Sequence, residues 1–187
     1  MARIRSQCAG VPSTCPGGKR CPHAIYSKVP SPFQRLNVDP KLACEFLGVF
    51  ARFEFALKAG GFADGDANGV GPKWHEFAQA IDAHFNPAKS PALNQAVDYL
   101  LNQPPKKQVL INNLIAWRDA PPDANLCRTE RVLLMLRRVR NNLFHGGKFL
   151  APESTASDRD KLLVQHSLTI LTACISLHGQ VAAAYEN

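Results

Sequence analysis

The sequence predicts a mainly α-helical fold, an antiparallel helical bundle that carries one short β-hairpin and follows an irregular N-terminal arm. Three observations lead to this prediction. Apolar residues recur at helical spacing in several segments. Pairs of glycines or prolines end these segments, and the links between them are short. Six of the 14 prolines fall in residues 1–40, where they interrupt helices and strands. We therefore expect an arm over residues 1–38 and a helical domain over residues 39–187.

The first half of this domain is expected to form three helices. Asp39-Pro40 combines an N-cap with a first-turn proline, and Gly60-Gly61 follows the last apolar position of that segment. Ser90-Pro91 has the same cap and proline pattern. The expected elements are a helix at 39–59, a glycine-rich loop at 60–72, and helices at 73–86 and 90–102.

The second half is expected to begin with a β-hairpin over residues 107–118. Asn112-Asn113 divides two apolar runs, and asparagine tolerates the positive φ of a two-residue turn. A helix is the alternative for the same residues. Two long helices are then expected, over 124–145, where Gly146-Gly147 follows, and over 157–185.

The length and composition fit one globular domain. The chain has 187 residues, of which 45% are apolar, enough for a single core. No apolar run approaches the roughly 20 residues of a membrane span, and the N-terminus lacks the apolar stretch of a secretory signal. We therefore expect a cytoplasmic protein. A disulfide framework is not expected among its six cysteines.

The net charge of +7 is unevenly placed. Residues 1–35 hold six basic residues and no acid, while the remaining residues hold 16 Lys or Arg against 15 Asp or Glu. The arm could bind phosphates, although a solvated tail is the simpler interpretation. Its basic residues are Arg3, Arg5, Lys19, Arg20, Lys28 and Arg35.

The helix expected over residues 124–145 carries the candidate chemistry. Its apolar stripe consists of Val132, Leu136, Val139 and Leu143. Arg140 falls inside the apolar arc, where an arginine is costly unless it is paired. Asn141 and His145 are four residues apart and can touch. An arginine that neutralises a phosphate and an imidazole that moves a proton can together cleave a phosphodiester. The same pattern also fits an ion-paired arginine and a helix-capping histidine.

The segment Arg140-Asn-Asn-Leu-Phe-His145 resembles the signature of the HEPN superfamily, in which Arg is followed by four to six residues and then His at the end of a late helix. The polar residue after the arginine, here Asn141, is also usual in the family. The longer run 137–148 and the early segment 50–58 are similar to the family as well. The resemblance covers residues 40–185.

This resemblance implies a helical bundle that dimerises and cleaves RNA without a metal or cofactor. The ribose 2′-hydroxyl would attack the adjacent phosphate and leave a cyclic phosphate. Arg140 would bind the phosphate, His145 would act as acid or base, and Asn141 would position either. We add Glu54 as a partner expected to pair with Arg140. The residues expected to support the site are Glu54, Arg137, Arg138 and Lys148.

A toxin or defence effector is the biological role that this resemblance implies. A toxin subgroup of the family has a tyrosine two residues after the histidine, which its partner protein modifies. Gly147 stands there in this chain, so that mode of regulation is not expected, although an antitoxin or other regulatory protein remains among the expected partners. The alternative function is a non-catalytic HEPN-like module that binds nucleic acid or a protein.

Two metal-binding patterns are weaker. Residues 64–69 match the first half of a calcium loop, but His75 stands where the bidentate glutamate belongs. Cys8, Cys15, Cys21 and His23 have spacings unlike those of zinc sites. We therefore expect no metal. Trp117 is expected to pack, with base stacking as the alternative.

Overall fold

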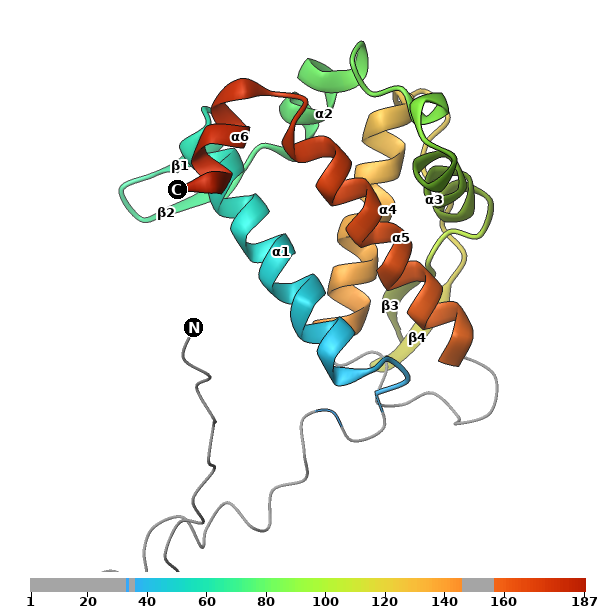
Figure 1. Cartoon of the computed structure of the whole chain (residues 1–187). Coiled ribbons are helices and arrows are strands. Elements are labelled where there is room, and N and C mark those ends of the chain that lie inside the picture. Colours follow the sequence, from blue (N-terminus) through green and yellow to red (C-terminus); the bar gives the residue numbers. More distant parts are fainter. Residues whose placement is uncertain (1–32, 34–35, 146–156) are drawn as a thin grey trace, which may run out of the picture. The chain divides into compact units, whose positions relative to one another are not determined.

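The computed structural model of this chain describes residues 33, 36–145 and 157–187. Residue contacts divide the chain into the units Met1–Gln34 and Arg35–Asn187, and the elements below belong to the second unit. The predicted mainly α-helical fold is confirmed. The elements are α1 (Pro40–Ala59), β1 (Ala63–Asp66), β2 (Gly69–Pro72), α2 (Trp74–Asp82), the 3₁₀ turn η2 (Pro87–Lys89), α3 (Pro91–Asn102), β3 (Lys107–Ile111), β4 (Leu114–Arg118), α4 (Arg128–Phe144), α5 (Ser157–Ile175) and α6 (Gly179–Glu186) (Figure 1).

Helix α1 begins and ends where the sequence predicts. The Asp39 carboxylate accepts hydrogen bonds from the backbone N–H groups of Lys41 at 2.9 Å and Leu42 at 3.2 Å. These bonds satisfy donors that a helix N-terminus leaves without partners. The buried face of α1 supplies much of the core through Phe46, Phe50, Phe53, Ala56 and Leu57.

The core lies where α1, α4 and α5 contact one another (Figure 1). Helix α5 also contacts α3, and α2 contacts α4. Rings of α1 pack against Trp74 of α2: the ring centroids of Phe53 and Trp74 are 5.5 Å apart and stacked. This aromatic packing fixes α1 against α2, which in turn contacts α4.

The loop predicted over residues 60–72 is instead a second hairpin, β1–β2. Its strands pair antiparallel with Asp64 opposite Gly71 and Asp66 opposite Gly69. Its turn is closed by a hydrogen bond of 2.7 Å from the Asn68 N–H to the Asp66 carboxylate. The prediction was wrong because these strands are exposed or half-buried and show no alternation of apolar and polar residues.

The boundaries of two predicted helices also differ. Helix α2 ends at Asp82 rather than near residue 86, because the N–H groups of both His84 and Phe85 turn back to the Ile81 carbonyl at 2.9 Å. Helix α4 begins at Arg128 rather than near residue 124. A capping box at its N-cap, Cys127, holds its first turn.

The single helix predicted over residues 157–185 is two helices. Their axes differ by 111°, and His178 has extended backbone angles at the junction (φ −137°, ψ 116°). The Leu177 N–H bonds to the Cys174 carbonyl in a tight turn, after which α6 folds back against α1. No single described helix is long and apolar enough to cross a membrane, and α5 and α6 satisfy that test only as this bent pair.

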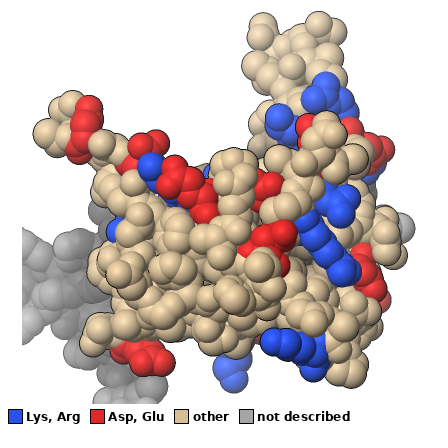
Figure 2. Space-filling view, turned by 90° about the horizontal axis from the view of Figure 1, so that it is seen from above, with Lys and Arg blue, Asp and Glu red and all other residues tan. Residues whose placement is uncertain are grey.

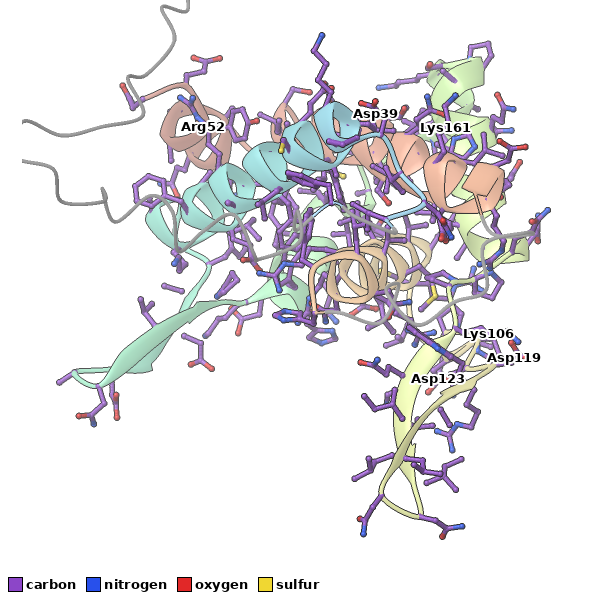
Figure 3. The ribbon with its side chains drawn as sticks, turned by 90° about the horizontal axis from the view of Figure 1, so that it is seen from below. Asp39, Arg52, Lys106, Asp119, Asp123 and Lys161 are labelled. Carbon is purple, nitrogen blue, oxygen red and sulfur yellow. The ribbon has the colours of Figure 1, made fainter. Side chains whose placement is uncertain are left out.

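The hairpin predicted over residues 107–118 is confirmed. Strands β3 and β4 pair antiparallel, with Lys107 opposite Arg118 at the base and Ile111 opposite Leu114 at the tip. Asn112 and Asn113 form the turn with φ values of 50° and 60°. Seen from below, both hairpins project from the helices (Figure 3).

Candidate functional site

Side-chain hydrogen bonds cap the N-terminus of α4, the helix that carries the candidate site at its C-terminus. The Cys127 thiol accepts from the Glu130 N–H at 3.5 Å, and the Glu130 carboxylate accepts from the Cys127 N–H at 2.8 Å. Thr129, fully buried, donates its hydroxyl to Asp82 of α2. This hydrogen bond lowers the pKa of Asp82, so the carboxylate stays charged at neutral pH.

The three residues predicted to be catalytic lie together at the C-terminus of α4. The Arg140 Nη1 is 2.8 Å from the His145 Nε2 and 3.1 Å from the Asn141 Oδ1. His145 is the C-cap residue, and its N–H bonds to the Asn141 carbonyl at 3.0 Å. The helix thus brings a cation, an amide and an imidazole to one point.

The contact between Arg140 and His145 indicates the role of one imidazole nitrogen. A guanidinium can only donate hydrogen bonds, so the His145 Nε2 is the acceptor in this contact. In this geometry Nε2 is a lone-pair nitrogen, which is the form that a general base needs.

Arg140 is half-buried against α1. Its guanidinium carbon lies 5.3 Å from the centroid of the Phe50 ring, in a cation–π contact. Its Nε is buried and has no hydrogen-bond partner among the described residues. Buried donors without partners are rare, and this one shows that the apolar arc tolerates Arg140 without a full set of bonds.

Glu54 does not pair with Arg140 as predicted. No ion pair joins these two residues within the described part of the chain, and the Glu54 Oε1 instead accepts from the Trp74 indole N–H at 3.3 Å. The nearby Arg137 guanidinium lies 5.6 Å from the Trp74 ring centroid. Burial lowers the pKa of Arg137, and the charge of Glu54 opposes that shift. The negative charge of Glu54 therefore favours the charged form of Arg137.

Arg138, expected to support the site, has a structural task. Its Nη1 donates to the carbonyls of Pro105, at 3.0 Å, and Ala120, which flank the β3–β4 hairpin. Burial lowers its pKa. One turn further along α4, the Asn142 amide donates to the Lys106 carbonyl at 2.9 Å. These bonds hold the hairpin base against α4.

A groove with a volume of about 550 Å³ opens between α4 and β3. Its described lining residues include four that carry or can carry positive charge and no acid. This composition attracts anions. The lining consists of Lys107, Gln108, Leu134, Arg137, Arg138, Asn141, Asn142 and His145, which we call the basic groove.

Lys107, Gln108 and Asn142 are site residues that the sequence reasoning missed. Asn142 lies directly after Asn141, but the helical wheel did not show which of the two meets the hairpin. Lys107 opens a predicted strand and could have been considered as a lone cation at a hairpin base. Only the packing of β3 on α4 brings Lys107 and Gln108 into the same groove as His145.

The other residues named in the sequence analysis lie away from this site or outside the described part of the chain. Lys148, the arm cations, Cys8, Cys15, Cys21 and His23 lie outside the described residues. The Asp66 carboxylate in the calcium-like segment binds the backbone of its own turn, which lowers its pKa. No group of three metal-ligating side chains occurs among residues 36–145 and 157–187. Trp117 lines a separate cavity of about 170 Å³ beside Val139 and Leu143.

Comparisons of this chain with family models, curated proteins and solved structures find no match.

Proposed function

We propose that this protein is a metal-independent endoribonuclease of the HEPN type, acting on RNA in the cytoplasm. One observation carries the proposal: Arg140 and His145 touch at 2.8 Å, and His145 also lines a groove that has cations and no acid among its described residues. The resemblance of residues 140–145 to the HEPN signature supports the same assignment.

In the proposed reaction, a phosphate of RNA lies beside His145 at the edge of the basic groove and takes as its partner the Arg140 guanidinium, which contacts His145 but is not itself a lining residue of the groove. The His145 Nε2, released from Arg140, accepts the proton of the ribose 2′-hydroxyl. The 2′-oxygen bonds to phosphorus and the bond to the 5′-oxygen breaks. That oxygen takes a proton from water, His145 gives the proton it accepted to the resulting hydroxide, and the products are a 2′,3′-cyclic phosphate and a 5′-hydroxyl.

The neighbouring residues have supporting roles in this proposal. Asn141, whose amide oxygen accepts from Arg140, orients the guanidinium. Lys107 and Arg137 attract the phosphates on either side of the cut. Arg138 acts only through the hairpin that it anchors, and Lys148 stays a predicted supporting residue.

We further propose that the enzyme works as a homodimeric toxin or defence effector that a regulatory protein restrains. Unrestrained cleavage of cellular RNA stops growth. Expression of the wild type is therefore expected to arrest cells, whereas expression of His145→Ala is not.

The test of the reaction uses purified full-length protein and single-stranded RNA in excess EDTA. Wild type is expected to cut the RNA, and His145→Ala and Arg140→Ala are expected to lose at least about a hundredfold in rate, the usual effect of removing an acid–base group or a charge-stabilising donor. His84→Ala, which removes another exposed histidine, is the matched control and keeps full activity.

Three results would contradict the proposal. Cleavage that survives in both Arg140→Ala and His145→Ala removes the reaction from this pair. Cleavage of DNA at the same rate excludes attack by the 2′-hydroxyl. Retardation of RNA in a gel without any shortening, at equal strength in wild type and variants, assigns the alternative binding module.

A further inference from the structure

The tip of the β3–β4 hairpin exposes four large aliphatic side chains. The exposed fractions are 68% for Leu110, 53% for Ile111, 72% for Leu114 and 56% for Ile115. Together they present on the order of 400 Å² of apolar surface, a size at which an uncovered patch marks an interaction site. We call these four residues, at the tip of the β3–β4 hairpin, the arm tip; they are separate from the N-terminal arm.

The arm tip is apolar on both faces. Leu110 and Ile115 are cross-strand partners, as are Ile111 and Leu114. Because successive residues of a strand point to opposite sides, one pair lies on each face of the hairpin. A hairpin packed on its own domain needs only one apolar face, so this tip is suited to being enclosed by another molecule.

The β1–β2 hairpin shows what a solvated projection looks like in the same molecule. Its strands consist mostly of Gly, Asp and Ala, and Val70 is its one large aliphatic residue. In the space-filling view it is the projection at the upper left with red side chains, whereas β3–β4 projects at the upper right with a tan tip and blue side chains near its base (Figure 2).

The base of β3–β4 is held firmly while the tip is bare. Arg138 and Asn142 of α4 donate to backbone carbonyls next to the hairpin. Lys106 and Asp119, which form an ion pair at 3.7 Å, lie where the hairpin leaves the helices (Figure 3). An isolated two-stranded hairpin is only marginally stable in water, so a partner that covers the tip would also stabilise it.

The apex of the hairpin argues for protein rather than lipid. Asn112 and Asn113 form the turn and are exposed. A hairpin that entered a membrane would bury these two amides deepest, where no partner exists for them. A protein surface can supply those hydrogen bonds.

We propose that the arm tip packs on a second copy of this chain. In such a pair, each β3–β4 hairpin would press its arm tip against the surface of the other copy. The two contacts together would bury on the order of 1,600 Å², the size of a standard stable interface. The chain also leaves apolar residues for an incoming arm, since Leu47 and Phe55 of α1 are 42% and 57% exposed. A symmetric pair of arms satisfies both surfaces at once.

The position of the arm gives this interface a consequence for the site. Strand β3 begins with Lys107 and Gln108, which line the basic groove. A second copy that is bound by the β3–β4 hairpin therefore lies beside the basic groove. The inference rests on the homodimer proposed above and names the surface through which it forms, but it does not depend on the cleavage reaction, since the arm tip contains no residue assigned to chemistry.

The experiment measures the mass of the full chain in solution by sedimentation or light scattering, at micromolar concentration and without RNA. Wild type is expected to have the mass of two chains. Leu110→Ser with Leu114→Ser, one change on each face, is expected to raise the dimer dissociation constant at least about tenfold. Val70→Ser on the other hairpin is the matched control and stays dimeric.

Folding and chemistry are checked separately. The serine variant should keep the wild-type circular dichroism spectrum, because its changed residues are exposed; if it does not, Ile115→Lys alone is expected to weaken the dimer in a folded chain. His145→Ala should remain dimeric, which separates this result from the cleavage assay. A monomeric wild type, or folded tip variants that dimerise as well as wild type, would overturn the inference. Vesicles of anionic lipid that bind wild type but not the tip variant would assign the surface to membranes instead.

Discussion

At the scale of single residues, the site depends on polar side chains that find partners inside an apolar setting. Arg140 sits in the apolar arc of α4, as its sequence position predicts, and rests on the Phe50 ring while its Nη1 contacts Asn141 and His145. Glu54 was predicted to be its partner on the same reasoning. Glu54 instead accepts a hydrogen bond from the Trp74 indole N–H of α2.

Thr129 offers a residue-scale prediction about stability and pH. Thr129→Val keeps the volume but removes the hydroxyl that Asp82 accepts, and it is expected to lower the free energy of unfolding by about 1–3 kcal/mol at pH 7. The same hydrogen bond lowers the pKa of Asp82 below its ordinary value of 3.8, so the stabilisation is present above pH 3.8 and is lost as the pH falls through the folded-state pKa.

Urea denaturation of wild type and Thr129→Val at a series of pH values checks this prediction. The difference in unfolding free energy should be constant near neutral pH and shrink in acid. A difference that stays the same at all pH values would show that the hydroxyl acts through packing alone.

At the scale of elements, close approach of backbones decides how α6 meets α1. A Cβ atom placed on Gly60 would lie 2.8 Å from the Ala56 carbonyl oxygen and 2.8 Å from the Val181 Cγ2. The C-terminus of α1 therefore accepts α6 only because residue 60 has no side chain. Arg52 completes this joint by donating to the Tyr185 carbonyl at 2.6 Å.

Two glycines of the same helix region give an element-scale prediction of opposite signs. Gly60→Ala is expected to lower stability by about 1–3 kcal/mol, because α6 must shift to make room. Gly48→Ala, in the middle of α1 with no atom near the new methyl group, is expected to raise stability by about 0.5–1 kcal/mol. Thermal melting monitored by circular dichroism distinguishes them, and equal effects of both substitutions would contradict the packing argument.

At the scale of the whole molecule, charge placement matters more than its total. Outside residues 1–35 the acids and bases nearly balance, yet the described lining of the basic groove has cations without an acid. A local positive surface on a nearly neutral domain should bind RNA with an affinity that falls as salt rises, because each phosphate contact releases bound counterions.

Salt titration of RNA binding, with His145→Ala used to prevent cleavage, tests this prediction. Lys107→Gln and Arg137→Gln in that background are each expected to weaken binding and to reduce the slope of log affinity against log salt by about 0.7. Lys41→Gln removes an exposed cation of α1 and should leave the slope unchanged. Equal slopes in all of these variants would place the RNA elsewhere.

The sequence by itself determined the features that lie within one element. Caps and apolar spacing gave the bounds of α1 and α3, and Asn112-Asn113 gave the β3–β4 hairpin. The meeting of Arg140, Asn141 and His145 also follows from spacing along one helix. Such features depend on neighbours in the chain, whose geometry the helix or turn fixes.

Only the tertiary structure decided the features that join distant segments. It placed β3 beside α4 to form the basic groove, and it directed Arg138 to hydrogen-bond carbonyls next to the β3–β4 hairpin. It also turned the chain at His178 so that α6 returns to α1. It also left each of the four side chains of the arm tip more than half exposed. These outcomes depend on which surfaces pack together, and the periodicity of a sequence shows which face of a helix is apolar without showing what will cover it.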